Sequence, residues 1–187
     1  MNVGTKSVLF GAHQFAIHPW FVMAAWWKLY GFPWDARLWI AFFVHDFGYF
    51  GKPNMDGPEG ETHVEFGAHL MAALFGEEWG NFCRYHSRFY AKRDGVNVSR
   101  LCIADKLAIC MTPAWMYLPM AKATGEIYEY QKLGKDESAA NKYATMNVYN
   151  DDLRKWYINV QTYLRRWVDE HKDGRADTWT PSLGKKQ

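Results

Sequence analysis

Residues 38–46 of the chain read LWIAFFVHD, and this stretch gives the strongest indication of the fold. Seven apolar residues follow one another from Leu38 to Val44, and with their neighbours they predict a buried helix at about 35–47. The run ends on His45 and Asp46, which lie about 100° apart on a helix and can therefore address one ion. The stretch predicts a helical core with metal-binding groups at its end.

The helical period recurs on both sides of this stretch. It predicts further helices at about 19–30, 61–75, 77–90, 99–111 and 153–168, and no alternating β pattern of useful length is present. The Gly- and Pro-rich segment 48–60 predicts a structured loop. We therefore predict an all-α fold with a single helical domain over residues 1–171. This domain includes an amphipathic C-terminal helix, and a polar, flexible tail follows at 172–187.

The composition limits the classes of partner. The 187 residues include 22 Lys and Arg against 20 Asp and Glu, which gives a formal net charge of +2. A chain so near neutrality offers no basic surface for duplex nucleic acid and no polybasic patch for a membrane. Residues 7–27 lack charge over a length that could span a bilayer. His13, Gln14, His18 and Pro19 favour a buried helix pair there instead, so we predict no membrane partner.

The cysteines and aromatic residues carry two further expectations. Three cysteines without a CxxC pair predict reduced thiols and a cytoplasmic protein, and the N-terminus shows no signal-peptide pattern. The chain contains 10 Trp, 11 Tyr and 12 Phe. We expect these rings mostly in the core, where Trp26, Trp27, Trp34 and Trp39 flank the first two long helices. A stacking platform for a nucleobase is the alternative.

Polar side chains interrupt the apolar faces of the other predicted helices. Asp105 lies at the centre of an apolar stripe, where a carboxylate is costly unless it is paired or binds a metal. His63 and His86 also lie on apolar faces, and His18 opens an otherwise apolar helix. Each histidine alone is more simply explained as a hydrogen-bonded core residue. With the His-Asp pair at 45–46, however, they make a set of imidazoles and two carboxylates of the kind that binds Mn, Fe, Co or Zn.

Two further histidines, His69 and His13, could in principle belong to this set. His69 lies six residues after His63, about 120° around the helix, and should not share the site. His13 could replace His18 as the first ligand. We prefer His18 because it begins the Trp- and Ala-rich helix. On the face of His63, Gly67 would let another helix approach closely.

The order of these residues, with His18 first, then the His-Asp pair, then His86 and Asp105, resembles the HD-domain superfamily of metal-dependent phosphohydrolases. The signature of that superfamily is His…His-Asp…Asp on an all-helical core. The segment HVEFGA at 63–68 is similar to the one that supplies a second-metal histidine in its HD-GYP branch, and IADKL at 103–107 is similar to its closing Asp helix. The resemblance covers roughly residues 14–111.

The chain differs from the HD-GYP branch at defined positions. Ser87 replaces the second member of a His-His pair, and DGVN at 94–97 stands where that branch has a Gly-Tyr-Pro loop. The lysine of its His-Asp-x-Gly-Lys motif is displaced by three positions, to Lys52. We therefore do not predict cyclic-dinucleotide hydrolysis.

The resemblance implies a set of site residues and a cofactor. Two divalent transition-metal ions are implied, Mn or Fe above all, with Co, Ni, Zn or Mg as alternatives. The residues implied for the first ion are His18, His45, Asp46 and Asp105, and those for the second are Asp46 as a bridge, His63 and His86. A cation is also needed for the charge on the phosphate. Lys52 is the first candidate, with an exposed loop lysine as the alternative. Arg88 is the second, and it reaches the site only if its helix ends or bends at Ser87.

The implied function is hydrolysis of a nucleotide or another small phosphoester by a metal-activated hydroxide that bridges two ions. Asp46 and Lys52 would act in catalysis, and Lys52 and Arg88 would bind the substrate. Two alternatives stay open: a di-iron oxygenase on the same fold, and a non-catalytic ligand-binding module. The expected partner is a small phosphorylated molecule, and a homo-oligomer is compatible with the sequence.

Overall fold

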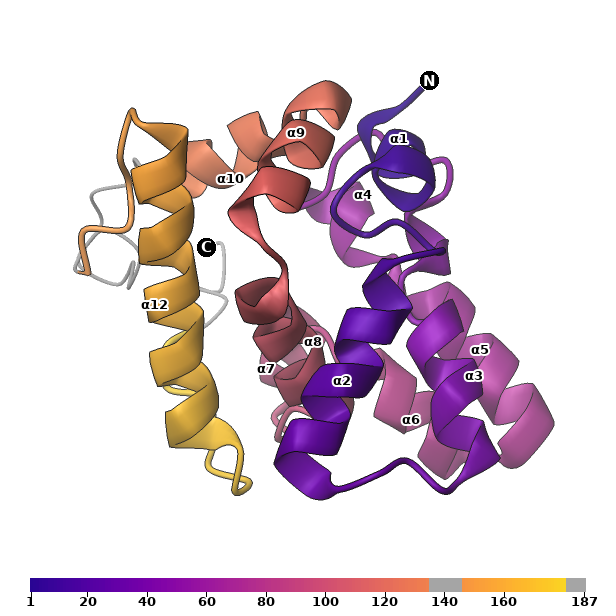
Figure 1. The fold of residues 1–187 in the computed structure, drawn as a ribbon. Helices are drawn as coiled ribbons and strands as arrows, with labels where there is room; N and C mark the ends of the chain where they lie inside the picture. Colours follow the sequence, from indigo (N-terminus) through magenta and orange to yellow (C-terminus); the bar gives the residue numbers. More distant parts are fainter. Residues whose placement is uncertain (135–145, 181–187) are drawn as a thin grey trace, which may run out of the picture.

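The computed structural model of the protein describes residues 1–134 and 146–180, and every regular element within them is helical (Figure 1). The elements, in chain order, are α1 (Val3–Phe10), α2 (His18–Tyr30), α3 (Ala36–Val44), the 3₁₀ helix η1 (Phe47–Tyr49), α4 (Pro58–Glu61), α5 (Val64–Phe75), α6 (Glu77–Arg84), α7 (Arg88–Asp94), α8 (Arg100–Met111), α9 (Ala114–Thr124), α10 (Glu126–Gly134) and α12 (Leu153–His171). The all-α prediction is confirmed, and α12 is the predicted C-terminal helix.

The central helix is α8, which is buried along most of its length and packs between α2 and α12 (Figure 1). In Figure 1, α3, α5 and α6 form a group on the other side of α2 from α12, while α1, α9 and α10 gather at one end. Within residues 1–134 and 146–180, no single helix is both long and apolar enough to cross a bilayer. The helices α8 and α9 meet that test only as a pair bent by 105°.

Side-chain caps explain where several helices begin. Asp35, Ser99 and Asp152 precede α3, α8 and α12, and the side chain of each accepts a backbone N–H of the first turn. Such a cap satisfies one of the donors that a helix start leaves unpaired. At the other end of α2, Gly31 takes a φ of 88°, a conformation that favours glycine and stops the helix.

Three predicted helices are shorter than the sequence indicates, and each interruption places a histidine at a helix end. The helix predicted at 61–75 begins at Val64, directly after His63. The helix predicted at 35–47 ends at Val44, so His45 and Asp46 lie in the turn before η1. The helix predicted at 77–90 breaks into α6 and α7, and His86 lies in the break. Side chains at such turns do not follow the helical repeat, so they can point inward.

The predicted tail at 172–187 is docked in the part that the structure describes. Asp177 Oδ1 accepts hydrogen bonds from Trp167 Nε1 at 3.0 Å and from the backbone N–H of Trp179 at 2.9 Å. Trp179 Nε1 in turn donates to Glu170 Oε2 at 3.0 Å. Residues 177–180 therefore pack against α12 rather than forming a free tail. The remainder of that prediction, residues 181–187, lies outside the described residues.

Candidate metal centre

Six buried side chains converge in the interior from distant parts of the chain. They are His18 at the start of α2, His45 and Asp46 between α3 and η1, His63 just before α5, His86 between α6 and α7, and Asp105 within α8. Their ligand atoms form two groups that share Asp46, and within each group these atoms lie within 4.8 Å of one another. The structure thus brings together all six residues that the sequence predicts as metal ligands.

The first group joins α2, α8 and the turn after α3. His18 Nε2 lies 3.0 Å from Asp105 Oδ1 and 3.5 Å from Asp46 Oδ2. His45 Nε2 lies 3.1 Å from the same Asp46 oxygen and 4.0 Å from Asp105 Oδ1. Two imidazole nitrogens and two carboxylates therefore face one point.

The second group lies on the other side of Asp46. The Nε2 atoms of His63 and His86 are 3.0 Å apart, and they lie 3.9 Å and 3.4 Å from Asp46 Oδ1. Asp46 thus directs Oδ2 to the first group and Oδ1 to the second. A carboxylate placed in this way is suited to bridge two cations.

Three of the four imidazoles are oriented by a hydrogen bond from Nδ1 to the backbone carbonyl three residues earlier. His45 donates to Phe42 at 3.0 Å, His63 to Gly60 at 2.8 Å, and His86 to Cys83 at 2.5 Å. This bond directs Nε2 at the centre of the cluster. A backbone carbonyl on the second ring nitrogen is also the usual outer partner of a metal-ligating histidine.

The cluster carries negative charge in the interior. Burial alone would raise the pKa of Asp46, but the electrostatic attraction of the adjacent His45 imidazole lowers it well below its ordinary range. Burial would likewise raise the pKa of Asp105, but Lys106 and His18 lower it well below that range. Two ionised carboxylates in the interior require cations beside them.

Two buried atoms at the shared carboxylate lack a hydrogen bond. His45 Nε2 and Asp46 Oδ2 have no hydrogen-bond partner within the described parts of the chain, although they lie 3.1 Å apart. Buried polar groups in native proteins are nearly always satisfied. A divalent cation between the two atoms would satisfy both, so the residues present fit a metal ion.

Two glycines let the backbone close around the cluster. A Cβ atom on Gly48 would lie 1.8 Å from the carbonyl oxygen of His63, so only glycine allows η1 to contact the turn before α5. A Cβ atom on Gly67 would lie 3.0 Å from the carbonyl oxygen of Val44 and 3.2 Å from His45 Cα. The prediction that Gly67 allows a close approach is confirmed.

The structure does not bring Lys52 to the six ligand side chains. Its ammonium group donates a hydrogen bond to the hydroxyl of Thr62. In residues 1–134 and 146–180 it makes no hydrogen bond or ion pair with the ligand set. Its neighbour Thr62 directly precedes His63, so Lys52 helps to hold the turn that carries this histidine.

Arg88 points away from the cluster, which corrects its predicted place in the site. The helix does end before Ser87, as the prediction required, but Arg88 Nε donates to Asp177 Oδ2 at 2.8 Å. Its guanidinium also donates to the hydroxyl of Tyr163 at 3.2 Å and lies 4.7 Å from the ring centre of Trp167. The buried carboxylate and the aromatic face of α12 hold Arg88 in a structural role.

Lys106 is a cation at the cluster that the sequence analysis missed. Its Nζ donates to Asp105 Oδ2 at 2.8 Å, and its side chain is 25% exposed. The signal was present in the sequence, because Lys106 directly follows a predicted ligand, just as Asp46 directly follows His45.

The two remaining histidines take the places that the prediction preferred. His69 lies outside the cluster, with a side chain that is 76% exposed. His13 belongs to neither group of candidate ligands. Its Nδ1 lies 3.3 Å from Glu126 Oε2, and Ser7 Oγ donates to the same oxygen at 2.6 Å. Burial lowers the pKa of His13, but the bond to Glu126 and the negative charges of Asp46, Glu126 and Asp105 together outweigh it and raise the pKa to about 9. Sequence analysis missed buried Glu126, whose partner lies 113 residues away.

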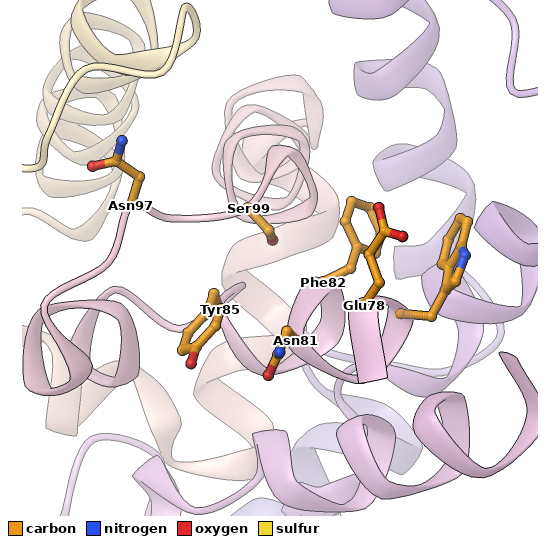
Figure 2. A pocket seen from close by; sticks show the side chains of 7 residues that line it. Glu78, Asn81, Phe82, Tyr85, Asn97 and Ser99 are labelled. Atoms are coloured by element: carbon orange, nitrogen blue, oxygen red, sulfur yellow. The ribbon is translucent and has the colours of Figure 1, made fainter. Parts of the chain in front are cut away.

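Two pockets differ in their relation to the cluster. A narrow one is lined by His13, His18, His45 and Asp46 together with apolar side chains. A larger one of about 270 Å³, shown in Figure 2, lies between α6 and the segment that carries Asn97 and Ser99. Because no predicted site residue lines the larger pocket, only the narrow one connects with the proposed chemistry.

A comparison of the chain with protein-family models, with curated proteins and with solved structures found no match. The case for function therefore rests on the geometry of the six side chains.

Proposed function

We propose that the protein is a metal-dependent phosphohydrolase that holds two divalent transition-metal ions, Mn or Fe above all, and hydrolyses a small phosphoester. The observation that carries this proposal is the position of Asp46, whose two oxygens face two separate groups of ligand atoms. Two cations about 3.5–4 Å apart are a recurrent device for displacement at phosphorus. The resemblance to the HD-domain superfamily supports the same reaction class.

Each of the six side chains has an expected role in binding the two ions. When bound, the two ions would supply an activated water nucleophile and neutralise charge on the phosphoryl oxygens. His18, His45 and Asp105 would hold the first, and His63 and His86 the second, with Asp46 between them. Burial and the adjacent His86 imidazole lower the pKa of His63 well below its ordinary range, and burial also lowers that of His86. Both imidazoles are therefore neutral at pH 7, as ligands must be.

We assign the cationic role to Lys106. A phosphohydrolase needs a positive group where charge develops on the phosphate. The ammonium group of Lys106 already lies at the cluster, 2.8 Å from Asp105 Oδ2, and its side chain is 25% exposed. Lys52 and Arg88 are instead engaged by Thr62 and Asp177.

The proposal is tested by assay of the Mn²⁺- or Co²⁺-loaded protein without oxygen against a panel of nucleotides and simple phosphoesters. Hydrolysis is indifferent to redox state, so phosphate release without oxygen is expected. Asp46→Ala, assayed in parallel, excludes a contaminating phosphatase. Silence with every phosphoester, together with iron-dependent oxygen uptake by the same protein, would overturn the proposal in favour of a di-iron oxygenase.

A further inference from the structure

The narrow pocket beside the first ligand group has an apolar entrance. The polar side chains of His13, His18, His45 and Asp46 line it, and the other lining residues are apolar, with Phe15 and Phe47 among them. Its free volume, about 10 Å³, is about enough for one water molecule. No Lys or Arg lines it within the described residues.

Aromatic side chains continue from this pocket onto the surface. The ring of Phe15 lies 6.1 Å from that of Phe47, which lies 6.2 Å from Phe66, and Phe43 lies 5.7 Å from Trp20. Phe15, Trp20 and Phe66 are 43%, 50% and 52% exposed. We call these five residues the aromatic rim.

The aromatic rim differs from isolated aromatic residues on the protein surface. Single exposed aromatic residues, such as Trp115 on α9, are common and need no explanation. Here, however, the exposed Phe15 lines a pocket that candidate metal ligands also line. The exposed Trp20 and Phe66 lie against Phe43 and Phe47, which line the same pocket. Large exposed apolar side chains at the entrance of a polar site are typical of a surface that a ligand covers.

We infer that the substrate of this centre carries a large apolar group next to its phosphate, and that the aromatic rim binds this group. The inference rests on the proposed phosphohydrolase function and names its substrate class. An alkyl chain and a fused aromatic ring share the required chemistry, because both gain from contact with aromatic faces and from leaving water.

Binding of phosphonates tests the inference without turnover, because a phosphonate has no P–O–C bond to hydrolyse. Methylphosphonate, hexylphosphonate and 1-naphthylphosphonate are titrated into the Mn²⁺-loaded protein by calorimetry, below the concentration at which any of them aggregates. At least one of the two larger compounds is expected to bind about tenfold or more tightly than methylphosphonate, since each buried methylene contributes about 0.8 kcal/mol. Which of them gains more distinguishes an alkyl from an aryl substrate.

Variants of exposed rim residues locate the binding surface. Phe15→Ala and Trp20→Ala should each weaken the binding of the two larger phosphonates about three- to tenfold. The affinity for methylphosphonate should stay unchanged. Trp115→Ala, a matched change of an exposed ring outside the rim, should alter none of the three. Equal affinity for all three phosphonates, or rim variants that behave like Trp115→Ala, would overturn the inference. Phosphate release from simple esters in that case would leave the proposed phosphohydrolase function standing.

Discussion

The Nε2 atoms of His63 and His86 lie 3.0 Å apart in the interior, while the Nδ1 atom of each ring donates to a backbone carbonyl. The pKa of each ring is lowered, chiefly by burial. Two neutral rings held in this way direct lone pairs at each other, which is unfavourable without a positive charge between them. Asp46 Oδ1, 3.4 Å from His86 Nε2, supplies the negative oxygen that would complete the coordination of a cation there.

Removing the shared carboxylate should affect both ions. Asp46→Ala is expected to abolish metal binding and phosphoester hydrolysis together, because Asp46 belongs to both ligand groups. The measurement is metal content and turnover of the same purified sample. His69→Ala, a change at an exposed histidine, should leave both at the wild-type level. Full activity of Asp46→Ala would exclude the two-metal mechanism.

Variants of Lys106 and Lys52 test which of the two lysines supplies the positive charge for catalysis. Lys106→Met should lower kcat about 10²-fold, the usual loss when one charge-stabilising donor is removed. Lys52→Ala, which removes a bond to Thr62 outside the cluster, should lower it far less. Metal content measured alongside distinguishes lost charge from lost ligation. If Lys52→Ala lowered kcat more than Lys106→Met, the catalytic role would belong to Lys52, as the sequence indicates.

The ion pair between Arg88 and Asp177 should stabilise the fold rather than serve the reaction. Both side chains are largely buried, at 14% and 7% exposed, and breaking such a pair typically costs about 3–5 kcal/mol. Arg88→Ala is therefore expected to lower the free energy of unfolding in urea by that amount, with kcat of the folded protein unchanged. Arg93→Ala, which breaks an exposed pair with Asp94, should cost at most about 1 kcal/mol. A stable Arg88→Ala protein with impaired turnover would contradict this account.

At low pH, Asp177 should no longer contribute to the free energy of unfolding. Burial alone would raise its pKa, but the bonds from Arg88 and Thr180 lower it well below the ordinary value of 3.8. A carboxyl group with a lowered pKa stabilises the folded state fully above its unfolded pKa, and this stabilisation is lost as pH falls toward the folded pKa. The difference in unfolding free energy between wild type and Asp177→Asn should therefore be constant from pH 7 to about 5 and shrink below about 4. A difference that stays constant down to pH 3 would show that the charge of Asp177 is not what stabilises the segment.

The sequence predicts this protein best where the signal is local. The helices follow from apolar periodicity, and the six ligands follow from imidazoles and carboxylates on apolar faces, which are costly without a partner. The fate of Arg88 could not be predicted in this way, because Asp177 lies 89 residues later. The exposed aromatic residues show the same limit. Trp27 and Trp34, expected in the core, are 56% and 87% exposed, since periodicity does not reveal which apolar face stays uncovered.

The most direct test of the two-metal centre is the number of metal ions per chain, measured by inductively coupled plasma mass spectrometry on wild type and His86→Ala. The geometry predicts two ions in the wild type. It predicts one in His86→Ala, because that change removes a ligand from the second group and leaves His18, His45, Asp46 and Asp105 in place. A wild-type protein that takes up no transition metal, or a His86→Ala variant that still retains two ions, would contradict the account.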